Sequence, residues 1–150
     1  MEEFNTIEKV VELFRSITAL GQDNAFFIAC QDKQHVVGVE AGMEYPYDGL
    51  LINSTEQGII AFYLKNPLGG LIGLSKAEKM KLARDKFIFI PTSNIKGVTI
   101  KKFALLNSKV KRVTIDTVDG KSHKLYARID EKEFPYHKDG FAKFIDKYSK

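Results

Sequence analysis

Three strand-like runs follow one another in the last part of the chain: KFIFIPTSNIKGVTIKK (86–102), VKRVTIDTV (110–118) and KSHKLYARI (121–129). A helical spacing then relates Phe141, Phe144, Ile145 and Tyr148. Residues 86–150 therefore predict an antiparallel meander that is closed by a short amphipathic helix. The same residues include 15 Lys and Arg against 7 Asp and Glu, a net charge of +8, which favours an anionic partner.

The last two runs predict a hairpin whose register follows from the parity of its apolar residues. A two-residue Asp119-Gly120 turn would place Ile115 opposite Lys124 and bury a charge. A three-residue loop, 118–120, sets Val113 opposite Leu125 instead. We therefore predict a type I turn with Gly120 in the left-handed region.

Residues 6–20 predict an added helix near the N-terminus, with Asn5 as its N-cap and Gly21 at its end. Its apolar stripe consists of Phe4, Ile7, Val10, Val11, Phe14, Ile17 and Thr18. Because the stripe is too short for an independent coiled coil, we expect residues 1–22 to pack on the domain formed by residues 23–150. Pairing with a second copy in a homodimer is the alternative.

From Ala25 onward the apolar period changes to two. Residues 25–33 and 34–40 predict one hairpin, and residues 49–54 and 58–65 predict another. Residues 66–85 interrupt this pattern with a glycine-rich apolar loop and then one or two helical turns after Ser75. Pro91 predicts a bend within 86–102. Together these segments predict a mainly β (α+β) fold, a strongly bent seven-stranded antiparallel barrel capped by the C-terminal helix.

Length and composition fit one globular domain. A chain of 150 residues buries enough surface to fold without a disulfide or metal. Its single cysteine, Cys30, excludes an internal disulfide, and we expect it to be buried and structural. The acidic N-terminus differs from a signal peptide, and the longest apolar run, 58–64, is too short to cross a membrane. We therefore expect a cytoplasmic protein.

Several of these segments give the chain a resemblance to a known family. The segments are 49–55 leading into 58–63, 87–95, 113–115 with Asp119-Gly120, and 141–145. In this pattern residues 25–149 resemble the bacterial pleckstrin-homology-like domains. The resemblance implies a nearly closed barrel of seven strands with a helical cap, which serves as a binding platform for lipids, peptides or other copies of itself. The N-terminal helix lies outside the family pattern.

No spacing in the sequence is typical of a catalytic or metal centre. The histidines, His35, His123 and His137, are scattered. The glycine-rich segment ends in Gly73-Leu74-Ser75-Lys76, which is the wrong order for a phosphate-binding P-loop. We therefore predict a protein that is not an enzyme and needs no cofactor. Its expected role is that of an interaction module that binds a protein partner or self-associates.

The first candidate contact surface is an apolar and basic segment, residues 68–86. It contains Leu71, Ile72 and Leu74, followed by Lys76, Lys79, Lys81 and Arg84. Apolar side chains beside lysines suit insertion into an anionic membrane surface. This segment gives the alternative function, peripheral binding at the inner face of the membrane. In the other interpretation its leucines cover one end of the barrel.

A second basic patch consists of Lys101, Lys102, Lys111 and Arg112. Basic residues near loop mouths grip phosphoinositide head groups in pleckstrin-homology domains, but the family's basic turn is replaced here by Gln31-Asp32-Lys33-Gln34. Phe103 beside the lysines would support a stacked base, which makes nucleic acid a third and weaker choice of partner.

Charge is divided unequally along the chain. Residues 1–75 carry a net charge of −6 and residues 76–150 a net charge of +10. This division favours an anionic partner on one face, or docking of two copies through opposite charges. If the two halves interleave in the fold, the charges mix on the surface instead.

Overall fold

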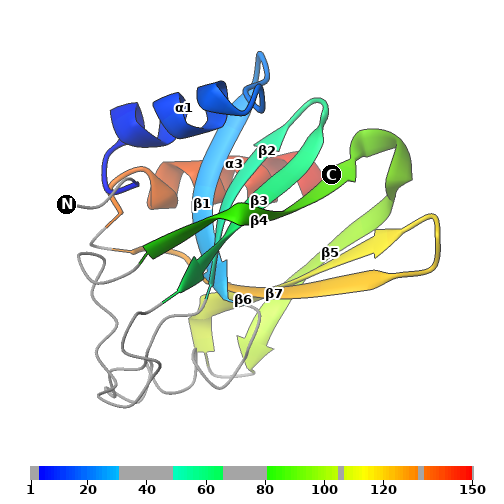
Figure 1. Cartoon of the computed structure of the whole chain (residues 1–150). Helices are drawn as coiled ribbons and strands as arrows, with labels where there is room; N and C mark the ends of the chain where they lie inside the picture. The colour runs from blue at the N-terminus through cyan, green and yellow to red at the C-terminus, as the bar shows by residue number, and fades with distance from the viewer. Residues whose placement is uncertain (1–3, 31–48, 66–80, 105–106, 132–133, 150) are drawn as a thin grey trace.

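Seven strands form one antiparallel sheet in the order β4-β3-β2-β1-β7-β6-β5 (Figure 1). The strands are β1 (Asn24–Cys30), β2 (Gly49–Thr55), β3 (Gly58–Lys65), β4 (Lys81–Pro91), β5 (Ile95–Ala104), β6 (Asn107–Thr117) and β7 (Ser122–Arg128). Helix α1 (Ile7–Ser16) precedes the sheet and α3 (His137–Tyr148) follows it. The computed structural model describes residues 4–30, 49–65, 81–104, 107–131 and 134–149.

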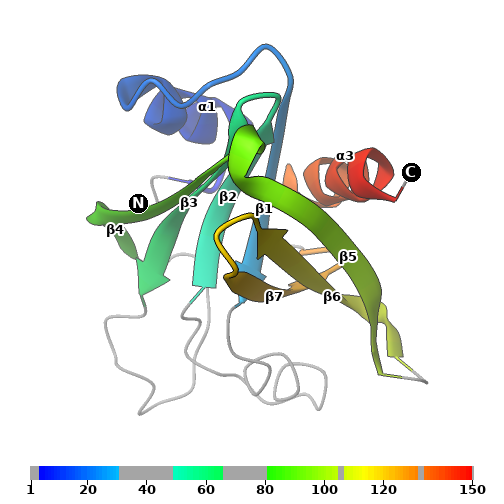
Figure 2. The same cartoon turned by 90° about the vertical axis from the view of Figure 1, so that its right-hand side faces the viewer.

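The sheet bends into two parts that cross one another. Figure 2 shows β1–β4 on one side and β5–β7 crossing beside them. The two parts meet where β1 lies next to β7, through the pair Cys30 and Tyr126. The prediction of a mainly β fold with a helix at each end is confirmed, and the arrangement is consistent with a pleckstrin-homology-like barrel.

Two of the predicted hairpins are present. Strands β2 and β3 are joined by a two-residue turn that places Thr55 opposite Gly58, so Thr55 belongs to β2 and not to the predicted connection, 55–57. In the last hairpin Val113 lies opposite Leu125, as the parity of the apolar residues predicts. The Thr117 N–H donates to the Lys121 carbonyl at 2.9 Å, and Gly120 has a φ of 90°. The three-residue loop with a left-handed glycine is therefore confirmed.

Strand β4 differs from the prediction. The run 86–102 divides at Pro91 into β4 and β5, with the 3-10 turn η2 (Thr92–Asn94) between them. Residues 81–85 belong to the strand and are not helical, because Lys81 lies opposite Lys65 in a ladder with β3. Pairing with β3 thus overrides the local helix signal. The predicted strand 34–40 lies outside the described residues, as do positions 66–80 of the predicted irregular segment 66–85.

Helix α1 begins and ends at residues other than those predicted. Thr6, not Asn5, is the N-cap, and its hydroxyl accepts the Lys9 N–H at 3.3 Å. The Asn5 side chain accepts from the Lys9 ammonium instead. The helix ends at Ser16, because Thr18 adopts a left-handed φ of 55° and the Ala19 N–H bonds back to the Phe14 carbonyl.

Both faces of β1–β3 are buried, which explains why these strands are apolar on both sides. One face packs against β6, β7 and α3 around Phe27, Phe141 and Phe144. The other face lies under α1, where the Phe14 ring is 5.4 Å from the Phe62 ring. The predicted α1 stripe is wrong at two positions, because Ile7 is 41% exposed and Thr18 is exposed beyond the end of the helix; it also omits the buried Leu13.

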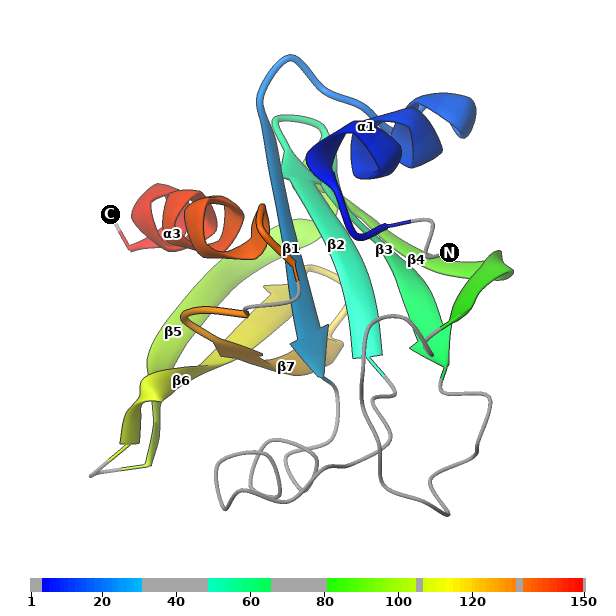
Figure 3. The ribbon, with the colours of Figure 1, turned by 90° about the vertical axis from the view of Figure 1, so that its left-hand side faces the viewer.

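Helix α3 takes the place of a strand along most of the free edge of β1. Figure 3 shows α3 and α1 on either side of this strand. The Ile28 N–H donates to Nδ1 of the buried His137 at 2.9 Å. Gly140 lies against the Phe26 carbonyl, and the Lys143 ammonium donates to the Asn24 carbonyl at 3.0 Å. One helix face, at positions 137, 140 and 143, therefore follows β1 residues 28, 26 and 24 in turn.

The hydrogen bonds of His137 define its tautomer. Because Nδ1 accepts from Ile28, the ring proton is on Nε2, which donates to the Arg128 carbonyl at the end of β7. The imidazole thus bridges β1 and β7 where the two strands separate. Burial lowers the pKa of His137, although the nearby Asp130 charge acts in the opposite direction.

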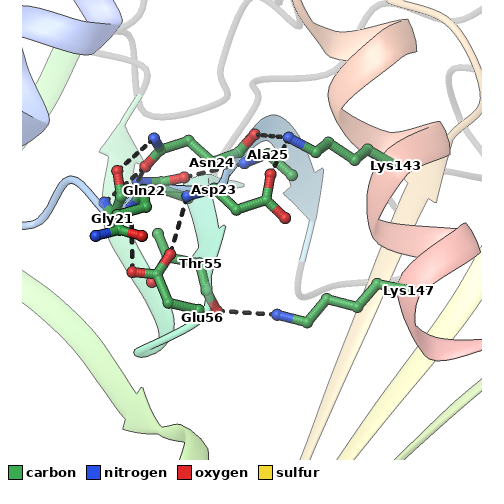
Figure 4. Close-up of polar contacts among 10 residues, drawn as sticks. Gly21, Gln22, Asp23, Asn24, Ala25, Thr55, Glu56, Lys143 and Lys147 are labelled. Carbon is green, nitrogen blue, oxygen red and sulfur yellow. Dashed lines mark hydrogen bonds and ion pairs between the residues drawn. The ribbon is translucent and has the colours of Figure 1, made fainter.

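A polar network joins the α1–β1 connection to the β2–β3 turn and to α3 (Figure 4). The Glu56 carboxylate accepts the N–H groups of Asp23 and Gln22, and these bonds lower the pKa of Glu56. The buried Asn53 amide donates to the Ala19 carbonyl and accepts the Ala25 N–H. The Lys147 ammonium donates to the Thr55 carbonyl at 3.0 Å, so α3 is held at both ends.

The close approach of α3 to β1 predicts the effect of Gly140→Ala. Alanine normally stabilises a helix by about 1 kcal/mol relative to glycine. Here its Cβ would lie 1.8 Å from the Phe26 carbonyl oxygen, so we expect a loss of about 1–3 kcal/mol in the free energy of unfolding. Urea denaturation measures this loss. At Gly97 nothing lies within 4 Å of an added Cβ, so Gly97→Ala is the control. A neutral or stabilising Gly140→Ala would contradict the packing.

The buried imidazole predicts that stability decreases in mild acid. Below the ordinary histidine pKa of about 6.5 the unfolded chain binds a proton at position 137. The folded chain resists that proton because its His137 pKa is lowered, so the free energy of unfolding falls as the pH falls through this range. Urea denaturation at a series of pH values measures the slope. His137→Gln should flatten the slope and His123→Gln should preserve it; equal slopes in all three proteins would refute the assignment.

Candidate functional site

Several reactive side chains of the described residues take part in structural contacts. Among the described residues, no group of three or more His, Cys, Asp or Glu side chains could hold a metal ion. Cys30 is buried, and His137 is bonded to two backbone groups. The Tyr136 hydroxyl donates to the Phe4 carbonyl, and burial raises its pKa. The candidate sites are therefore surfaces.

The predicted apolar and basic segment is only partly described. Leu71, Ile72, Leu74, Lys76 and Lys79 lie outside the described residues. Lys81 and Arg84 belong to β4: Lys81 lies opposite Lys65, and Arg84 falls where the register with β3 shifts. The proposed membrane contact of this segment stays a prediction.

Two exposed aromatic rings mark the outer part of β4. Phe87 is 55% exposed and Phe89 is 53% exposed. Phe87 lies opposite Phe62, and Phe89 lies opposite Ile60, so both rings continue the sheet face that α1 covers on β1–β3. The alternate residues, Ile88 and Ile90, turn toward the core. An apolar strip therefore extends beyond the part of the face that α1 covers.

The backbone groups of Phe87 and Phe89 point toward the open edge of the sheet. The Thr92 N–H donates to the Gln57 carbonyl at 3.0 Å, which fixes the phase of the β3–β4 ladder. In that phase Ile88 and Ile90 bond to β3, while Phe87 and Phe89 turn their N–H and C=O groups outward. Pro91, which lacks an N–H, belongs to the outward set, as expected at an edge. In the described part of the chain, no strand pairs with this edge.

The second basic patch divides between the two faces of the β5–β6 hairpin. Lys101 lies directly opposite Arg112, and Lys102 lies directly opposite Lys111. Because side chains alternate along a strand, the two pairs point to opposite faces. Lys102 and Lys111 share the face of Val113. The four residues therefore do not form one patch.

The face with Lys101 and Arg112 contains a hollow that the sequence analysis missed. Its volume is about 280 Å³. The lining residues come from three neighbouring strands and are Thr99, Lys101, Arg112, Thr114 and Lys124. Thr114 lies opposite Thr99 on one side and opposite Lys124 on the other. Part of this hollow follows from the predicted register of the last hairpin. If Val113 lies opposite Leu125, then Thr114 lies opposite Lys124 on the other face.

A groove lies between the starts of α1 and α3. It has a volume of about 580 Å³ and includes Ile7, Phe26 and Tyr136 in its lining. Glu8 and Asp139 also line it, each in the first turn of a helix, where the helix dipole favours a negative charge. The groove has the size of a small-molecule site. Its two carboxylates are explained by the helix starts, and its one ammonium, that of Lys143, is bound by Asn24 and Asp23.

Neither described helix has the length and hydropathy needed to cross a bilayer. No protein-family model matches the chain, and no curated protein is similar to it in sequence.

Proposed function

We propose that this protein is a non-catalytic interaction module of the pleckstrin-homology-like type, which self-associates by adding an extended strand along β4. The observation that carries the proposal is that Phe87 and Phe89 expose their rings and direct their backbone groups outward at the same sheet edge. A protein strand that pairs there satisfies the backbone groups and covers the rings. Burial of each phenylalanine contributes about 1.5–3 kcal/mol.

The neighbouring residues limit the length of the added strand. At one end Pro91 offers no N–H group. At the other end the register with β3 shifts between Phe62 and Tyr63, so residues 84–86 interrupt the ladder. Natural proteins use proline and irregular pairing to keep sheet edges from uncontrolled association. The site therefore accepts a short strand, centred on residues 87–89.

A second copy of the chain is complementary to this edge. If two β4 strands pair antiparallel about Ile88, Phe87 of one copy lies opposite Phe89 of the other. Both residues direct their backbone groups outward, so each cross-strand pair exchanges hydrogen bonds. Aromatic residues opposite one another stabilise antiparallel pairs by about 0.2–1 kcal/mol each. The same surface joins both copies, as in most symmetric dimers.

The alternative function, peripheral binding to an anionic membrane through residues 68–86, keeps its support from the sequence. Basic residues beside apolar ones are its basis. In the structure residues 81–86 are part of β4. We therefore favour protein contact at this strand.

Sedimentation velocity across a wide range of concentrations tests the proposal. The wild-type chain should form a dimer as concentration rises, and Phe89→Lys should remain monomeric because a lysine would lie in the paired aromatic strip. Val118→Lys is the matched control. Val118 is 66% exposed but lies in the β6–β7 turn and not on β4, so its substitution should not affect dimerisation. A wild-type chain that stays monomeric at every concentration contradicts self-association. A dimer that survives Phe89→Lys contradicts the β4 edge.

A further inference from the structure

The outer face of β5–β7 carries an unusual concentration of positive charge. Lys101 and Arg112 are direct cross-strand neighbours, and Lys124 lies diagonally across from Arg112 on β7. Like charges directly opposite one another in a sheet destabilise the pair. The same repulsion between like charges occurs on the other face of the β5–β6 hairpin, where Lys102 lies opposite Lys111.

Among the described residues, no carboxylate forms an ion pair with these three cations. The side chains of Lys101, Arg112 and Lys124 form no hydrogen bond or ion pair with any group there. The acidic residue of β6 on this face, Asp116, accepts a hydrogen bond from the Ser122 hydroxyl. Helices α1 and α3 pack elsewhere, so the face is not covered by either helix.

The side chains around the hollow suit a tetrahedral oxyanion. Arg112 offers a planar fork of N–H donors, and Lys101 and Lys124 offer point charges on either side. The hydroxyls of Thr99 and Thr114 line the same hollow and can donate hydrogen bonds. Hydrogen bonds from charged donors to an anion are about twice as strong as neutral ones. Five donor residues thus converge from three strands of a rigid sheet.

We propose that this hollow binds the phosphate group of a phosphomonoester. Two negative charges on one compact group match the three cations better than a single carboxylate does. The volume of about 280 Å³ accommodates a phosphate with a small attached group and lies just below the usual range for drug-sized ligands. The site goes beyond the proposed self-association, because it lies on β5–β7 and not on β4.

Titration calorimetry at low ionic strength, with glycerol 3-phosphate, a soluble phosphomonoester, as the probe, tests the site. The wild-type chain should bind one equivalent saturably, and Arg112→Gln should weaken binding about tenfold or more. Lys138→Gln removes the same charge from an exposed position on α3 and should leave the affinity unchanged. Thermal melts should show Arg112→Gln to be folded, because the substitution removes a repulsion with Lys101.

Two outcomes would overturn the proposal. One is the absence of saturable binding by the wild-type chain. The other is an equal loss of affinity in Arg112→Gln and Lys138→Gln, which would reduce the effect to net charge.

Vesicles identify the source of the phosphate. Co-sedimentation with vesicles of phosphatidic acid, a monoester, that depends on Arg112 supports a lipid source. Binding of glycerol 3-phosphate without co-sedimentation supports a soluble ligand. Equal co-sedimentation with phosphatidylglycerol, a diester, would contradict recognition of a monoester.

Discussion

The fold depends on how the second edge of β1 is satisfied. Among the described strands, β1 is the one that pairs with both parts of the sheet, since it lies between β2 and β7 in the strand order. Within the described residues, however, its pairing with β7 is limited to Cys30 and Tyr126. The N–H of Ile28, two residues before Cys30, has no partner on β7. Without α3 it would be buried and unpaired, which costs about 1–3 kcal/mol. Helix α3 removes this cost with the imidazole of His137, and Gly140 allows the helix to come close enough.

The same closure determines which surfaces remain available for binding. Because α3 occupies the edge and one face of β1, the other apolar face of β1–β3 requires a second cover, which α1 supplies through Leu13 and Phe14. The cover ends before β4, so Phe87 and Phe89 remain exposed. The outer face of β5–β7 needs no cover, since it carries threonines and cations. An apolar edge and a basic face thus arise at opposite ends of one sheet.

The parts of the fold that were predicted from sequence are those that depend on local patterns. Parity of apolar residues was sufficient for the last hairpin, because a slip by one residue would have buried Lys124. The apolar spacing of Phe141 and Phe144 was sufficient for the capping helix. The start of β4 was not predicted, because residues 81–83 are strand only by virtue of their pairing with β3. The N-cap was misplaced because Asn5 and Thr6 are both good capping residues.

The candidate sites were harder to predict, because they depend on which strands become neighbours. The four residues of the predicted basic patch form two cross-strand pairs on opposite faces of the sheet. The third cation beside Lys101 and Arg112 is Lys124, which is on β7, across the β6–β7 turn. The role of His137 also had no local signal. Gly140 did provide a local signal. Glycine is unfavourable inside a helix, so its presence there indicates that another backbone comes close.

Hydrogen exchange at the Ile28 amide tests the closure of β1 by α3 most directly. If the His137 imidazole accepts this N–H, its exchange should be slow, comparable to that of amides in the β1–β2 ladder. The amides of Phe87 and Phe89, which face the open edge of β4, supply the fast reference under conditions where the chain is monomeric. An Ile28 amide that exchanges as fast as these two would show that α3 does not seal the edge of β1.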